Sequence, residues 1–250
     1  EYIRNGRLGK IKEVIVDVGG PSKWCDLPEE QMEPGLDWDT WLGPAPKRPY
    51  NSVLAPRGVH NHYPAWRNYR EYSGGMMTDW GAHHFDITQW GLAMDDAGPS
   101  EIIPPEDPKK GRGVKFIYPR TPVGDNVTVI HGQCGGVEFR GELGSINVNR
   151  GHIRSDPESI LQEPLGDDKV SVFKSPGHHE NWLNCIKTRE KPICDVEVGA
   201  RSVTVCHLGN LAYWNGKAMK WDPRKWAFAD DTPAEWLDRE RREPWTLPAI

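Results

Sequence analysis

The chain has 250 residues, of which 37% are hydrophobic, and carries a net charge of −5. Basic residues are scattered among acidic ones, which argues against a nucleic-acid-binding surface, and no run of 18 apolar residues is present to span a membrane. Twelve tryptophans supply large apolar side chains, and 26 glycines and 22 prolines indicate many loops. No linker divides the chain, so we expect one domain over residues 1–250.

The first hundred residues predict one strand, a long loop and two helices. Residues 11–18 alternate between apolar and polar side chains, as a half-buried strand does. Residues 20–60 are rich in proline, glycine and tryptophan and are expected to form an ordered loop. Residues 64–72 are compatible with a short helix, and the spacing of residues 78–92 predicts a longer one.

The second part of the chain predicts a group of strands followed by helices. Short turns join successive runs with strand patterns, which favours an antiparallel meander. The predicted strands are residues 114–118, 126–131, 136–140, 145–149 and 170–173. Helices are expected at residues 177–188 and 196–214, and a short one from residue 231. This grouping indicates an α+β fold.

Residues 73–86 carry the most informative pattern of the chain. Asp79, His83, Asp86 and Trp90 are spaced so that they share one helix face. A carboxylate one turn from an imidazole can relay a proton or contribute to a metal site. The alternative is an amphipathic helix with a structural histidine. His84 points to another face and is expected to be structural.

These residues resemble a known family. Gly74-Gly75 followed by Asp-x-x-x-His-x-x-Asp is similar to the substrate-domain motif of the glucose-fructose oxidoreductase / inositol dehydrogenase (Gfo/Idh/MocA) family. The resemblance runs in order from about residue 2 to about residue 245. It is also carried by residues 38–46, 141–146, 197–202, 208–212 and 220–223.

The resemblance implies a fold, a reaction and a cofactor. The family's second domain is an open, mostly antiparallel sheet with helices packed on one face, and its other face usually packs against a second subunit. A homo-oligomer is therefore expected. In the family, the residues corresponding to Asp79 and His83 lie beside the substrate hydroxyl that NAD(P) oxidises. No Gly-x-Gly-x-x-Gly is present here, so the nucleotide-binding domain is expected to be absent and NAD(P) not to bind this chain alone.

Other polar and aromatic side chains are candidates for binding a sugar or polyol. Several precede the motif, and a histidine pair opens the helix at residue 178. The candidate substrate-binding residues are His60, His62, Arg67, Trp80, Asp86, His178 and His179. For each, solvated surface or loop packing is the alternative. A metal ion is possible but not expected, because no tight ligand motif is present.

Three functions remain open at this point. The first is the sugar- or polyol-binding catalytic domain of an oxidoreductase that needs a nucleotide domain from elsewhere. The second is a complete non-redox glycoside hydrolase or lyase, with or without a metal, in which Asp79 and His83 work with Glu142 or Asp86. The third is binding or assembly without catalysis. An odd number of cysteines without Cys-x-x-Cys favours a cytoplasmic location, although a removed N-terminal signal stays open.

Overall fold

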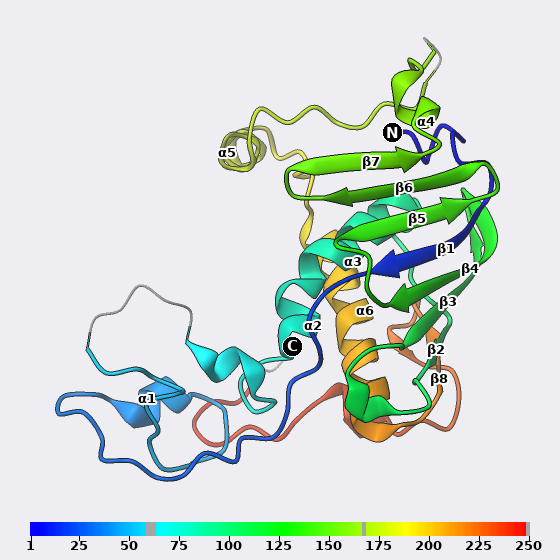
Figure 1. Cartoon of the computed structure of the whole chain (residues 1–250). Coiled ribbons are helices and arrows are strands. Elements are labelled where there is room, and N and C mark those ends of the chain that lie inside the picture. The colour runs from blue at the N-terminus through cyan, green and yellow to red at the C-terminus, as the bar shows by residue number, and fades with distance from the viewer. Residues whose placement is uncertain (59–63, 167–168, 249–250) are drawn as a thin grey trace.

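A computed structural model describes residues 1–58, 64–166 and 169–248, in which nine strands form one open sheet (Figure 1). The spatial order is β7-β6-β5-β1-β4-β3-β2-β8-β9, and every pairing except β1 with β4 is antiparallel. The strands are β1 (Ile11–Val16), β2 (Glu101–Ile103), β3 (Lys115–Thr121), β4 (Gly124–His131), β5 (Val137–Gly141), β6 (Gly144–Asn149), β7 (His152–Asp156), β8 (Met219–Asp222) and β9 (Ala227–Phe228). The expected fold class is confirmed.

Two long helices, α3 and α6, pack against each other and cover one face of the sheet (Figure 1). Within the described residues, no helix is both long and apolar enough to cross a membrane. The α-helices are α1 (Trp38–Leu42), α2 (Met76–Asp79), α3 (Gly81–Gly91), α4 (Ser159–Gln162), α5 (His178–Thr188) and α6 (Val196–Asn215). Short 3-10 helices are η1 (Ala65–Asn68), η2 (Pro108–Lys110) and η3 (Ala234–Leu237).

The core lies between the sheet and these helices. Along β1, Val14 and Val16 are fully buried, whereas Ile15 between them points to the other face and is half-buried. Phe85 of α3 and Phe116 of β3 meet edge to face with ring centroids 5.3 Å apart. The alternation in the sequence therefore corresponds to alternate burial along β1.

The sheet differs from a simple meander because β1 is inserted between β4 and β5. The predicted strand at residues 170–173 is wrong. Val170 donates its backbone N–H to the Asn5 side chain and accepts from the same amide, so an asparagine takes the place of a neighbouring strand. β2, β8 and β9 were not predicted, because two to four residues carry too little periodicity, and β7 was also missed.

The predicted helix at residues 78–92 begins two residues earlier, at Met76. It is divided at Trp80, which keeps right-handed helical angles, so side chains on both sides still follow one helical period. The predicted helices at residues 177–188 and 196–214 correspond to α5 and α6. The loop at residues 20–60 contains α1, whose Trp38 and Trp41 stack at 4.5 Å between ring centroids.

A buried histidine ties the sheet to α6. His131 has no exposed surface, and its Nε2 donates to the Val18 carbonyl at 2.9 Å. Nδ1 therefore accepts the Tyr213 hydroxyl hydrogen at 2.6 Å, and that hydroxyl accepts the Val114 N–H. A proton on Nδ1 would displace the Tyr213 hydroxyl hydrogen from this bond, and burial lowers the pKa of His131 below its ordinary value.

We expect this histidine to make the protein less stable in mild acid. Above pH 6.5, the ordinary histidine pKa, both the folded and the unfolded states hold His131 neutral. As the pH falls below that value, only the unfolded state takes up the proton, so the free energy of unfolding decreases by up to about 1.4 kcal/mol per pH unit. Urea unfolding between pH 8 and pH 5 measures this slope. His131→Gln should make it shallower, whereas His179→Gln on the exposed face of α5 should not; equal slopes in all three proteins would contradict the assignment.

Candidate functional site

The candidate site begins where the backbone enters α2. Gly75 is the N-cap of α2 with φ +72°, a conformation that favours glycine. A Cβ on Gly75 would lie 2.5 Å from the Ser22 nitrogen, so the two chain segments touch through their backbones. The Gly74 carbonyl accepts a hydrogen bond from the buried Asn210 amide at 2.8 Å. The motif is thus fixed between the loop at residue 21 and α6.

Close helix packing continues along α3. A Cβ on Gly81 would lie 3.1 Å from the Cys206 sulfur, and one on Gly209 would lie 2.3 Å from the Met77 methyl carbon. Glycines on both helices therefore allow α2 and α3 to lie directly on α6. This packing determines where the side chains of the motif are presented.

Asp79 forms an ion pair with Arg67, whose Nε lies 2.6 Å from Oδ2 of Asp79. Each side chain is about a quarter exposed, with 25% for Arg67 and 27% for Asp79. Arg67 comes from η1, which precedes α2 in the chain. Among the described contacts, the carboxylate of Asp79 is paired with Arg67 and not with His83, which differs from the relay that the spacing suggested.

His83 is exposed one turn further along the helix. Its ring lies beside the indole of Trp80, with centroids 5.7 Å apart, and the guanidinium of Arg150 lies 4.4 Å from the Trp80 ring centroid. Trp80 is 40% exposed, so a solvent-facing aromatic surface adjoins the imidazole. His84 is buried instead, and its Nδ1 bonds the Asp17 carbonyl at 2.9 Å, in agreement with the structural role expected for it.

Asp86 follows His83 on the same helix face and is partly buried against α6. The Ser202 hydroxyl donates to its Oδ1 at 2.7 Å. Burial raises the pKa of Asp86 above its ordinary value, the Ser202 hydrogen bond opposes this shift, and the charge of Asp95 adds to it. Asp86 and Asp95 line a cavity of about 260 Å³ together with Trp90 and Cys194. An imidazole and a carboxyl group with a raised pKa one turn apart can exchange protons with a bound hydroxyl compound.

The remaining candidate residues are not gathered at this helix. His178 and His179 open α5, which lies apart from α2 and α3 in Figure 1, and their rings contact each other with centroids 4.3 Å apart. Both side chains are exposed. His60 and His62 lie outside the described residues.

Sequence reasoning missed two neighbours of the motif. Arg150 lies in the turn between β6 and β7, and only the pairing of those strands brings it to Trp80. Ser202 reaches Asp86 because α6 packs along α3. The sequence contains one indication of this contact, which is the position of Ser202 in the predicted helix at residues 196–214. Neither contact is local in sequence.

Metal binding has no support from side-chain geometry. Within the described ranges, no group of three or more histidine, cysteine, aspartate or glutamate side chains is arranged to hold a metal ion. The five cysteines are free thiols, and burial raises the pKa of Cys206, which has no exposed surface.

Comparisons with known proteins point to oxidoreductases. A family model described as "Oxidoreductase family, C-terminal alpha/beta domain" matches residues 21–247. No curated protein matches the chain. Nothing in the comparisons supports a glycoside hydrolase or lyase.

Solved structures include two similar ones. The WlbA dehydrogenase from Bordetella pertussis in complex with NADH and UDP-GlcNAcA is 18% identical, with a TM-score of 0.48, over 88% of this chain and 58% of its own length. An NAD-binding protein from Listeria innocua is 11% identical, with a TM-score of 0.45, over 88% of this chain and 64% of its own. The chain spans less than two thirds of each.

We expect Gly75→Ala to disrupt the start of the motif helix. The new Cβ would require the backbone at Ser22 to move, in addition to the strain of a left-handed alanine, so a loss of about 3 kcal/mol is expected in urea unfolding. Gly151→Ala is the matched control, because Gly151 has φ +82° and open space around its Cβ position. That change should cost about 1 kcal/mol. Equal losses would mean that the contact with residue 22 does not hold the helix start.

Proposed function

The chain belongs to the Gfo/Idh/MocA oxidoreductase family as its C-terminal alpha/beta domain, and from this premise we propose that it binds and orients the sugar or polyol substrate of a dehydrogenase. His83 is the proposed base, and Asp79 with Arg67 the proposed polar contact for a neighbouring hydroxyl. The observation that supports this proposal most strongly is the position of His83. It is exposed one turn beyond the ion-paired carboxylate of Asp79, on a helix whose start is fixed by backbone contacts.

The chemistry suits an imidazole. Oxidation of a secondary alcohol to a ketone removes a hydride from carbon and a proton from oxygen. A histidine ring titrates near neutral pH and can accept that proton from the hydroxyl. Trp80, which has Arg150 over its ring, offers an aromatic contact to a sugar beside the imidazole, and the carboxylate of Asp79 accepts a hydroxyl hydrogen bond.

The hydride acceptor in this proposal is NAD(P), the redox cofactor that takes up hydride. The residues of this chain do not fit a dinucleotide site. No glycine-rich turn joins a strand directly to a helix N-terminus in the described part, and such a turn is what normally holds a pyrophosphate. The cofactor site is therefore assigned to a nucleotide-binding domain that works with this one.

The uncovered face of the sheet supports an assembly role alongside substrate binding. Ile15 of β1 and Ile130 of β4 lie opposite each other, and Ile117 of β3 lies on the same face. All three are only half-buried, because α3 and α6 cover the other face. These isoleucines form a small apolar area beside the Arg140–Glu13 and Arg140–Glu138 ion pairs of the same face. An apolar centre with a charged rim is typical of a subunit interface, and a second copy of the chain is the proposed partner.

We predict that His83→Ala lowers kcat of the enzyme complete with its nucleotide domain by about 100-fold or more, because the proton acceptor is removed. A panel of sugars and polyols with NAD(P) identifies the substrate on which this is measured. His84→Ala is the control at the neighbouring position. It leaves the Asp17 carbonyl without its donor and should cost about 2 kcal/mol of stability, while kcat of the folded enzyme stays within a few fold. Equal effects of the two changes on kcat would refute the role of His83.

We also predict that the chain is not a monomer and that Ile130→Lys dissociates it. A charge in the middle of the open sheet face cannot be buried against a second copy without a large desolvation cost. Sedimentation equilibrium should change toward the monomer mass of 28.3 kDa. Leu143→Lys, in the exposed turn between β5 and β6, should leave the mass unchanged. A 28.3 kDa species in the unmodified protein at high concentration would end this proposal.

A further inference from the structure

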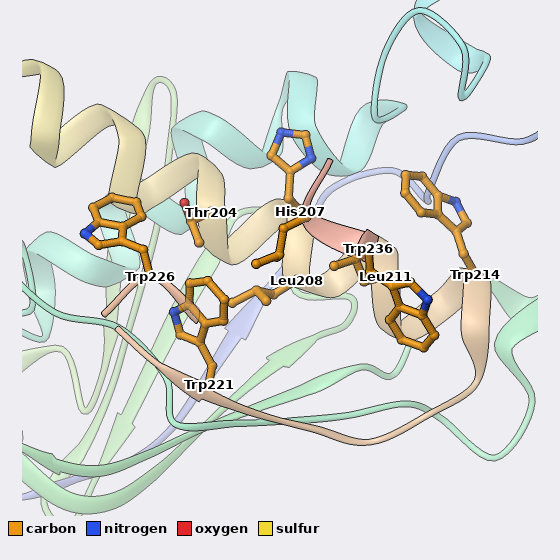
Figure 2. A pocket seen from close by; sticks show the side chains of 9 residues that line it. Thr204, His207, Leu208, Leu211, Trp214, Trp221, Trp226 and Trp236 are labelled. Atoms are coloured by element: carbon orange, nitrogen blue, oxygen red, sulfur yellow. The ribbon is translucent and has the colours of Figure 1, made fainter. Parts of the chain in front are cut away.

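A tryptophan-lined pocket lies on the side of α6 that faces away from the motif helix. Its volume is about 340 Å³, within the range of small-molecule sites. Four indoles line it, from Trp214, Trp221, Trp226 and Trp236. In Figure 2, Trp221 and Trp226 lie to one side of Leu208, and Trp214 and Trp236 to the other. None of Asp79, His83 and Asp86 lines this pocket.

Trp226 is the last residue of the turn that joins β8 to β9. Its φ is +53°, in the left-handed region that a bulky residue rarely adopts, and its side chain is 38% exposed. The Arg201 guanidinium lies 4.7 Å from its ring centroid. Arg201 is itself fixed by two hydrogen bonds to Glu197 and one to the Pro223 carbonyl. The Trp226 indole is therefore held at the pocket by a turn and by a fixed guanidinium, and a side chain that is fixed in advance binds a ligand at a lower entropic cost.

The other walls define the chemistry of the ligand. Trp221 is almost fully buried and closes the base of the pocket. Thr204 and His207 contribute polar groups from α6, and among the described lining residues there is no carboxylate, lysine or arginine. The pocket therefore suits an uncharged ring with an apolar face and a polar edge.

We propose that this pocket is a second carbohydrate site, separate from the His83 site, which takes one neutral pyranose ring against the indole of Trp226. The carbon–hydrogen face of a pyranose stacks on an indole, and its equatorial hydroxyls are available to Thr204 and His207. The proposal does not depend on the reaction assigned to His83.

The test measures binding of two neutral saccharides, methyl β-D-glucopyranoside and cellobiose, to the 250-residue chain by calorimetry and by indole N–H signals in nitrogen-15 NMR. We expect a Kd on the order of 1 mM and shifts of the Trp226 and Trp236 signals. Trp226→Ala and, independently, Trp236→Ala should each weaken this binding by about tenfold. Thermal unfolding checks that each variant is folded.

Two controls make the outcome decisive. Trp182→Ala removes an exposed indole from α5, outside both sites, and should leave binding unchanged. In His83→Ala, which changes only the other site, the Trp226 and Trp236 signals should still shift. Binding that survives both pocket changes, or no saturable binding by either saccharide, would overturn the second site. So would preferential binding of N-acetyltryptophanamide, which would identify the pocket as a site for an aromatic peptide side chain. Saccharide binding lost only in His83→Ala would overturn this site while leaving the proposed function intact.

Discussion

The hydrogen bond from Asn210 to the Gly74 carbonyl connects the two parts on which the candidate site depends. Asn210 is fully buried in the middle of α6, and Gly74 immediately precedes the N-cap of α2. A Cβ on Gly74 would lie 2.7 Å from the Asn210 nitrogen, so only glycine lets the two come together. Because α6 also covers the sheet, this contact fixes the direction in which Asp79 and His83 are presented.

Two carboxyl groups of the motif are placed in different surroundings by this packing. Asp79 is balanced by the guanidinium of Arg67, whereas Asp86 is partly buried beside Ser202 without a basic partner among the described ion pairs. Pairs of carboxyl groups in contrasting surroundings can divide acid and base roles between them. The exposed imidazole of His83 lies between them in sequence, which is why proton transfer is the chemistry assigned to this helix face.

Local patterns in the sequence predicted the parts of the fold that depend on neighbouring residues. The period of two identified β1, β3, β4, β5 and β6, and the Gly74-Gly75 motif identified the helix with Asp79 and His83. Non-local contacts were not predictable from one sequence. The insertion of β1 between β4 and β5, the Arg150 side chain over Trp80, and the Arg67–Asp79 ion pair all depend on which segments meet in three dimensions. The apolar run at residues 170–173 fails as a strand because the Asn5 side chain takes its backbone bonds.

The central claim is that the His83 face of the motif helix receives the substrate hydroxyl. The most direct measurement is proton NMR of the histidine ring signals while D-glucose and myo-inositol are titrated into the chain at neutral pH. The account predicts a saturable shift of the His83 ring signals and none at His178 or His179, which lie on α5 away from this helix. Saturable shifts confined to His178 and His179, with His83 unchanged for both compounds, would contradict it.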